Sequence, residues 1–156
     1  MEVQIRPARI SDIEKILSFM KAYYNFDQLE FNHLKAQSAL TNLIKNESYG
    51  KVWLVLDEGV EIGYIVITFG YSIEFGGLDA FIDEFFILED YRKRGAGGRT
   101  LLLVEQFLGD MNVEALHLEV DFQNEIAKQF YLSKGFDFRR RFRTMTKRFK
   151  STNAPA

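Results

Sequence analysis

The chain has 156 residues, of which 47% are hydrophobic and 27% are charged. This length and composition predict one soluble globular domain and exclude an intrinsically disordered protein. The formal net charge of −2 gives no general attraction to nucleic acid, and the absence of cysteine excludes disulfides, thiolate metal sites and a cysteine nucleophile. Without a membrane-length apolar run or a signal-peptide core, we expect a cytoplasmic protein that does not cross a membrane.

The first third of the chain is predicted to form one strand and two helices. Residues 3–8 have the pattern of a strand, and Ser11 with Glu14 forms a capping box that starts a helix. Asn32 is predicted to cap the second helix. Between the two helices, residues 25–31 are expected to form a polar, acidic loop.

The middle of the chain is predicted to be β-rich. Residues 50–57 and 60–71 are expected to form a hairpin that turns at Glu58-Gly59, and residues 78–88 a long strand after a second glycine turn. Ideal alternation along this strand places residues in two sets, Phe81, Asp83, Phe85 and Ile87 on one face and Ile82, Glu84, Phe86 and Leu88 on the other.

The last third is predicted to alternate helices and strands. A helix starts at Gly95, a strand spans residues 115–121, and a second helix, residues 124–134, is followed by a glycine in the C-terminal capping position. Residues 142–149 are expected to form a final strand with a solvated basic face, and residues 151–156 a disordered tail.

The order of these elements predicts an α/β (α+β) fold in a single domain of residues 1–150. A strand, a turn, a helix and a second strand form a right-handed crossover, so residues 78–88 and 115–121 are expected to pair in parallel. The other strands are expected to pair antiparallel, which gives a mixed, mostly antiparallel sheet with one parallel pair.

The turn before the third helix is the strongest functional signal in the sequence. It contains three glycines within eight residues, and four cations surround them: Arg92, Lys93, Arg94 and Arg99. Glycines let the main chain approach a ligand closely, and the free amides and dipole of a helix N-terminus favour an anion such as phosphate. The turn therefore predicts a phosphate-binding site.

Two common nucleotide motifs fit this turn poorly. A P-loop ends in Gly-Lys-Ser/Thr, whereas here the sequence is Gly97-Gly98-Arg99-Thr100. A dinucleotide-binding turn requires a third glycine where Thr100 stands, and its first glycine directly follows the strand. The charged stretch of residues 89–94 is too long for that arrangement.

The pyrophosphate of coenzyme A fits better, because the turn resembles the signature of the GNAT superfamily of N-acetyltransferases. Arg92, Gly95 and Gly97 match its Arg/Gln-x-x-Gly-x-Gly/Ala motif. A second family motif, Asn-x-x-Ala-x-x-Phe-Tyr-x-x-x-Gly-Phe, is similar to residues 124–136. Thr100 replaces the usual leucine, which we expect to affect packing. The resemblance implies a GNAT-like sheet with helices on both faces.

The resemblance also implies the residues that bind acetyl-CoA. These include the strand residues Phe86 and Ile87 and the helix residue Tyr131, and Asn124 is assigned to the pantetheine or adenosine side. The pyrophosphate is assigned to the turn and the first helical residues, which are Arg92, Arg94, Gly95, Ala96, Gly97, Gly98 and Arg99. No metal is expected, because two histidines without clustered carboxylates do not make a metal site.

The catalytic candidates follow from the need to deprotonate an amine and to protonate a thiolate. Glu84 occupies a position that the family often fills with an acid that acts as general base, and Asp83 is the second candidate because a β-bulge could exchange the two. Tyr131 is the candidate general acid for the departing thiolate. The amide near Ile87 is a candidate donor to the developing oxyanion. The resemblance implies direct attack in a ternary complex.

The acceptor is indicated only by local sequence. Residues 83–92 are particularly similar to diamine acetyltransferases, and several acids could attract a cationic amine, namely Asp27, Glu30, Glu74, Asp79 and Asp83. We therefore expect a small amine substrate, with no nucleic-acid or membrane partner and with a homodimer left open. A protein or peptide N-acetyltransferase and a non-catalytic acyl-CoA-binding module are the alternatives.

Overall fold

A computed structural model describes residues 1–149. The chain divides into two compact units, of which the first runs from Met1 to Glu119 and the second begins at Val120. Within residues 1–149, the first unit contains the sheet and three α-helices, and the second contains one α-helix. A single domain of residues 1–150 stays a prediction, and the predicted tail of residues 151–156 lies outside the described residues.

The sheet of the first unit confirms the predicted mixed topology. Neighbouring strands pair antiparallel except for the last two, which are parallel, as the crossover argument predicts. The hairpin turn has left-handed φ angles of 50° at Glu58 and 82° at Gly59, which suit a two-residue hairpin. In sheet order the strands are β1 (Val3–Pro7), β2 (Gly50–Asp57), β3 (Val60–Ser72), β4 (Gly77–Ile87) and β5 (Ala115–Leu118).

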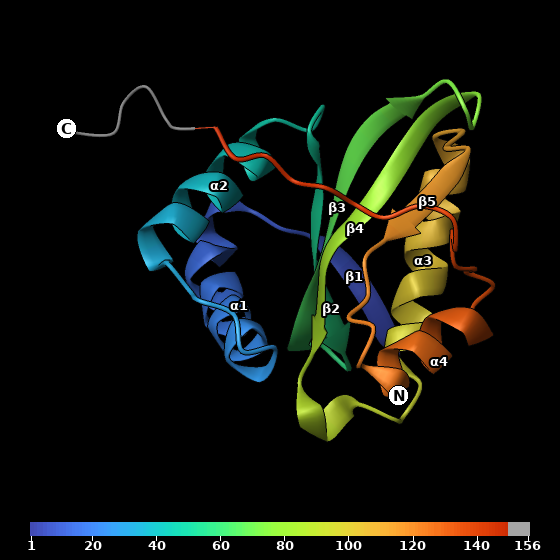
Figure 1. The fold of residues 1–156 in the computed structure, drawn as a ribbon. Coiled ribbons are helices and arrows are strands. Elements are labelled where there is room, and N and C mark those ends of the chain that lie inside the picture. The colour runs from blue at the N-terminus through green and yellow to red at the C-terminus, as the bar shows by residue number, and fades with distance from the viewer. Residues whose placement is uncertain (150–156) are drawn as a thin grey trace. The chain divides into compact units, whose positions relative to one another are not determined.

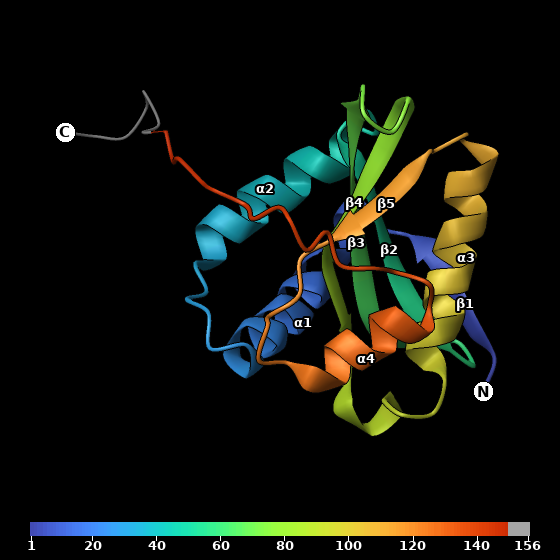
Figure 2. The same ribbon diagram turned by 45° about the vertical axis from the view of Figure 1, so that its right-hand side comes forward.

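Helices cover both faces of this sheet. On one face lie α1 (Ile13–Phe26) and α2 (His33–Lys45), side by side in both views, and on the other lies α3 (Ala96–Asp110) (Figures 1 and 2). The apolar stripe of α1, which includes Ile16 and Leu17, packs toward β3 and β4 in a shared core cluster. Among residues 1–149, no helix has the length and apolar character needed to cross a membrane.

The two helix starts have different outcomes. Asn32 caps α2 as predicted, because its Oδ1 accepts a hydrogen bond from the amide of Lys35 at 3.0 Å. The predicted capping box of Ser11 and Glu14 is wrong, because a 3₁₀ turn at Ile10–Asp12 precedes α1. The Asp12 carboxylate accepts from the Arg9 amide at 2.7 Å and pairs with Arg6, which fixes this turn before the helix begins.

A β-bulge changes the predicted faces of β4. Val66 and Ile67 are consecutive on β3, yet they pair with Glu84 and Ile82 on β4, so Asp83 is the extra residue. Cross-strand partners share a face, and consecutive residues on β3 point to opposite faces. Ile82 and Glu84 therefore lie on opposite faces, and the prediction that they share one is wrong.

The second unit contains α4 (Glu125–Ser133), and the predicted strand of residues 142–149 is wrong. Asn124 caps α4 through a 3.0 Å hydrogen bond from the Ala127 amide. Residues 142–149 form no strand, and their side chains are exposed, Met145 to 95%, so the alternation in their sequence buries no face. The guanidinium groups of Arg139 and Arg141 instead lie 4.5 and 5.3 Å from the ring centre of Phe142.

Candidate functional site

The loop between β4 and α3 ends in a turn that requires glycine. We call residues Arg92–Gly98 the glycine turn. Lys93 and Gly95 have left-handed φ angles of 57° and 91°, and Gly95 is the N-cap of α3. The first helical hydrogen bond runs from the Arg99 amide to the Gly95 carbonyl at 3.0 Å. The amides of residues 96–98 have no intrahelical acceptor at this position, so they can bind an anion together with the helix dipole.

Buried contacts hold the start of α3 against the sheet. Ala96 is buried against Val55, Ile62 and Ile87. Thr100 is fully buried, and its Oγ1 donates to the Ala96 carbonyl at 2.8 Å. Thr100 thus contributes to packing, as expected from its place in the motif, and it leaves the preceding amides available to a ligand.

Arg92 ties the glycine turn to the end of β4. Its Nε donates to the Ile87 carbonyl at 2.7 Å. Its guanidinium lies 4.8 Å from the ring centre of Phe26 on α1 and 5.2 Å from that of Phe86. These contacts within the protein are a structural reason for an arginine at this position. The cofactor-binding role of Arg92 therefore stays a prediction.

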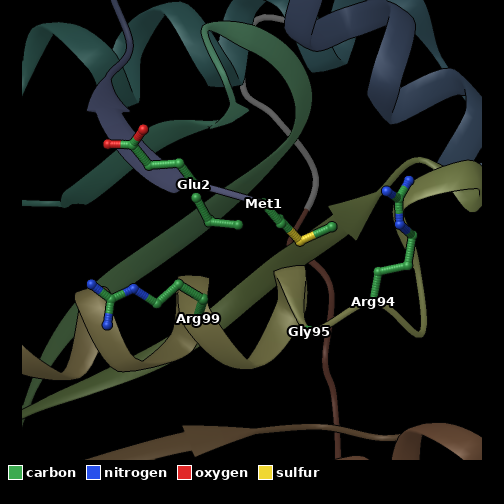
Figure 3. A pocket seen from close by; sticks show the side chains of 6 residues that line it. Met1, Glu2, Arg94, Gly95 and Arg99 are labelled. Atoms are coloured by element: carbon green, nitrogen blue, oxygen red, sulfur yellow. The ribbon is translucent and has the colours of Figure 1, made fainter.

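An open pocket of about 410 Å³ lies beside the glycine turn (Figure 3). Arg94, Gly95 and Arg99, all predicted cofactor residues, line it together with the first three residues of the chain. The Arg94 guanidinium makes one long hydrogen bond, 3.5 Å to the Asp90 carbonyl. Arg94 and Arg99 give this pocket positive charge, which, with the amides at the start of α3, fits a phosphate-bearing ligand.

The end of β4 presents main-chain groups on the side away from β3. The Leu88 amide donates to Ile62 on the β3 side at 2.8 Å. Hydrogen bonding alternates along an antiparallel ladder, so the Ile87 amide and carbonyl point to the opposite edge. On that edge β5 pairs only with Asp79–Ile82. The Ile87 amide can therefore donate to a ligand carbonyl, whereas the Phe86 amide faces β3 and the Phe86 side chain is buried in the core.

Glu84 lies between two tyrosine hydroxyls. The Tyr24 hydroxyl donates to its Oε1, and the Tyr64 hydroxyl donates to its Oε2 at 2.8 Å. Tyr24 comes from α1 and Tyr64 from β3, so three elements meet at one carboxylate. We call Glu84, Tyr24, Tyr64 and Asp83 the Glu84 cluster.

Burial sets the ionisation of this cluster. Desolvation raises the pKa of Glu84 above its ordinary value, and the charge of Asp83 raises it further, while the two tyrosine hydrogen bonds lower it. Burial, together with the nearby Glu84 carboxylate, raises the pKa of both Tyr24 and Tyr64, so both phenols stay protonated at neutral pH. A carboxylate with a raised pKa in a desolvated position is suited to accept a proton.

Asp83 occupies the bulge and is exposed. Partial desolvation, and then the charge of Glu119, raise the pKa of its carboxyl. Of the other predicted acids, Asp79 is a neighbour of His117, whose Nε2 lies 3.3 Å from its Oδ2, while Asp27 and Glu30 lie exposed after α1.

The second unit holds Asn124 and Tyr131, the two remaining predicted residues. The Asn124 side chain serves as the cap of α4. The Tyr131 ring packs edge-on against Phe130 and Phe136, with centroid distances of 5.0 and 5.5 Å. Burial raises the pKa of Tyr131 to about 12, so its hydroxyl is a proton donor at neutral pH. The functional roles of both residues stay predictions.

Two residues of the site were absent from the sequence-based set, namely Tyr24 and Tyr64. Tyr24 stands at the end of an amphipathic helix, and Tyr64 looks like any apolar residue of a central strand. Only the fold brings them to Glu84. Within residues 1–149 no group of three or more acidic or histidine side chains could hold a metal, and the expectation of a metal-free protein stays a prediction.

Comparison with known proteins matches this chain to acetyltransferases. The model of the Acetyltransferase (GNAT) family matches residues 15–136. The uncharacterized N-acetyltransferase YhfO of Bacillus subtilis (strain 168) is 24% identical over 136 residues, which cover 86% of this chain and 90% of YhfO. The family match includes both the glycine turn and residues 124–136.

Solved structures share the fold over nearly the whole chain. An integron cassette protein from the mobile metagenome of Cole Harbour Salt Marsh is 30% identical, with a TM-score of 0.79 and coverage of 97% of this chain and 92% of that chain. A predicted acetyltransferase from Clostridium acetobutylicum, solved with acetyl-CoA, is 16% identical, with a TM-score of 0.78 and coverage of 93% and 96%.

Proposed function

The chain belongs to the acetyltransferase (GNAT) family and is an acetyl-CoA-dependent N-acetyltransferase, and from this premise we propose that its acceptor is a small cationic amine. The proposal includes direct attack of the amine in a ternary complex. It also includes a preference for diamines, which the local similarity of residues 83–92 suggests.

Uncompensated negative charge beside the end of β4 supports this acceptor. Glu84, Asp83 and Glu119 have no salt bridge to lysine or arginine within residues 1–149. Desolvation raises the pKa of both Glu84 and Asp83, and a neighbouring carboxylate raises each further, Asp83 for Glu84 and Glu119 for Asp83. A cationic amine would relieve this repulsion, because an opposite charge nearby stabilises a carboxylate. The desolvated Glu84 carboxylate is the observation on which the proposal chiefly depends.

In the proposed reaction Glu84 removes a proton from the bound ammonium, directly or through water. Acetyl-CoA supplies the acetyl group as a thioester. The free amine forms a bond to the acyl carbon as the carbon–sulfur bond breaks, and the Ile87 amide stabilises negative charge on the carbonyl oxygen. Tyr131 gives its proton to the departing sulfur, and its phenolate then takes up, through water, the proton that the nitrogen loses as the amide forms. The products are an N-acetylated amine and coenzyme A.

Donor binding is assigned to the remaining residues. The amides of residues 96–98, with Arg94 and Arg99, are proposed to hold the pyrophosphate, and Asn124 the pantetheine or adenosine side. Support comes from the pocket beside the glycine turn and from the position of Gly95 as N-cap of α3. A cytoplasmic location and a homodimer stay predictions.

The test is thiol release from acetyl-CoA with a panel of acceptors. The chain has no cysteine and therefore adds no thiol background. We expect a diamine to exceed a monoamine of equal length by about tenfold in kcat/KM at low salt, because each acid near the site attracts the second charge. A peptide acceptor that exceeds every small amine would establish a peptide acetyltransferase instead. Binding of acetyl-CoA without thiol release from any acceptor would indicate a non-catalytic module.

A further inference from the structure

The Glu84 carboxylate is held from two directions by the protein itself. Each oxygen accepts one hydroxyl, Oε1 from Tyr24 and Oε2 from Tyr64. A carboxylate has about four lone-pair sites, so one on each oxygen stays free for a substrate proton or a water. The carboxylate is thus oriented but not saturated.

Both phenols are fixed by packing. Tyr64 is fully buried, and its ring stacks against Phe19 with an interplanar angle of 7°. Tyr24 is half-buried at the end of α1, where its ring makes edge contacts with Tyr23 and Phe31 at centroid distances of 5.7 and 5.5 Å. Two rigid rings from separate elements restrict the Glu84 side chain more tightly than either ring alone.

The hydrogen bonds also favour the ionised form of Glu84. They act against desolvation and against the neighbouring Asp83, both of which favour the protonated form. The charged and titratable groups around the carboxylate are Tyr24 from α1, Tyr64 from β3 and Asp83 from β4, and Tyr23 acts on both phenols. The guanidinium of Arg92 is stacked on Phe86 and makes no salt bridge to Glu84.

We propose that Tyr24 and Tyr64 are positioning residues that hold Glu84 in the orientation and ionisation state of a general base. This inference rests on the proposed role of Glu84 as the base. Neither tyrosine is required to touch the acceptor or acetyl-CoA. Tyr24 holds the carboxylate from the end of α1, and Tyr64 holds it from the central strand β3.

The first test replaces each hydroxyl with hydrogen. Tyr24→Phe and Tyr64→Phe keep the ring and remove one hydrogen bond to the carboxylate. We expect each to lower kcat/KM about tenfold near neutral pH and to move the acid limb of the pH–rate profile upward by about one unit, with acetyl-CoA affinity unchanged. Tyr49→Phe, an exposed tyrosine before β2, is the matched control and should behave as wild type.

A double-mutant cycle separates positioning from general destabilisation. In a Glu84→Gln background, Tyr24→Phe should cause no further loss of turnover, because the group that it positions is absent. The inference would be overturned if the losses of turnover in Tyr24→Phe and Glu84→Gln multiply in the double variant and the acid limb of the Tyr24→Phe pH–rate profile does not move. If Tyr64→Phe fails to fold, the half-buried Tyr24 decides the question in the same way.

The outcomes also separate this inference from the proposed function. Wild-type turnover in Glu84→Gln would reject the base role itself. Loss of turnover in Glu84→Gln, with wild-type turnover and an unmoved acid limb in both tyrosine variants, would reject only the positioning role.

Discussion

The glycine turn and the Glu84 cluster are built from different parts of the chain. The glycine turn offers main-chain amides from one continuous segment, Arg92–Gly98, at the N-terminus of α3. The Glu84 cluster uses side chains from α1, β3 and β4, and Tyr24 and Glu84 are separated by 60 positions. The first region depends on backbone conformation and the second on side-chain chemistry.

This difference has a consequence for substitution. A main-chain amide still donates its hydrogen bond after most side-chain substitutions. It is lost only when a new side chain fills the space of the ligand or cannot adopt the φ angles of the turn. A side-chain group is removed by a single conservative replacement. Variants should therefore separate acetyl-CoA affinity from turnover, and the predictions below run from the largest expected effect to the smallest.

Gly97→Asp should produce the largest effect. A carboxylate among the free amides of α3 would occupy the site proposed for the pyrophosphate and repel it, so we expect acetyl-CoA affinity to fall at least about 100-fold by calorimetry. Gly109→Asp on the same helix is the matched control, because a side chain there meets no atom within 4 Å. Retained affinity in Gly97→Asp would place the donor site elsewhere.

Tyr131→Phe should lower turnover by about 10- to 100-fold at saturating acetyl-CoA. The physical reason is loss of a proton donor whose pKa of about 12 keeps it protonated at neutral pH. Steady-state kinetics at saturating acetyl-CoA would measure this loss, and a separate binding measurement should show unchanged acetyl-CoA affinity. The exposed Tyr71→Phe is the control. Full turnover in Tyr131→Phe would remove the general-acid assignment.

Arg92→Lys tests whether the contacts of Arg92 are structural. Lysine cannot reproduce both the bond from Nε to the Ile87 carbonyl and the stacking on Phe26 and Phe86, so the unfolding free energy should fall by about 1–2 kcal/mol in urea titrations. Arg94→Lys should have a smaller effect. A large loss of acetyl-CoA affinity without loss of stability would instead make Arg92 a direct phosphate ligand.

The smallest expected effect is a pH-dependent change in stability. The pKa of Glu84 is raised in the folded protein, so its contribution to stability is complete below the ordinary value of 4.5 and is lost as pH rises through the folded-state pKa. Glu84→Gln stays neutral and avoids this loss.

The unfolding free energy of Glu84→Gln relative to wild type should therefore increase from about pH 4 to about pH 7. Urea titrations at both pH values measure it, with Glu14→Gln on the exposed side of α1 as control. A difference that falls with pH would mean that the carboxylate is stabilised in its charged form.

The two regions also explain which features could be predicted from sequence. The glycine turn is local, so the glycines that its backbone needs appear as a motif. The strand alternation and the crossover are likewise local patterns, and they predict the sheet and its parallel pair. The bulge at Asp83 could not be predicted, because it depends on how β3 and β4 pair in register.

The Glu84 cluster and the last third of the chain show the limits of local patterns. Tyr24 and Tyr64 have ordinary local surroundings, and only tertiary packing brings their hydroxyls to one carboxylate. Residues 142–149 alternate like a strand, but alternation stabilises a strand only when one face is buried against a partner.

The most direct test is one comparison of Glu84→Gln with wild type, in which kcat/KM for a small diamine is measured on samples of known acetyl-CoA affinity. We predict that Glu84→Gln lowers kcat/KM by about 100-fold or more while acetyl-CoA affinity stays within about twofold. Wild-type kcat/KM in Glu84→Gln, or an equal loss of acetyl-CoA affinity, would contradict the division between a main-chain donor site and a side-chain acceptor site.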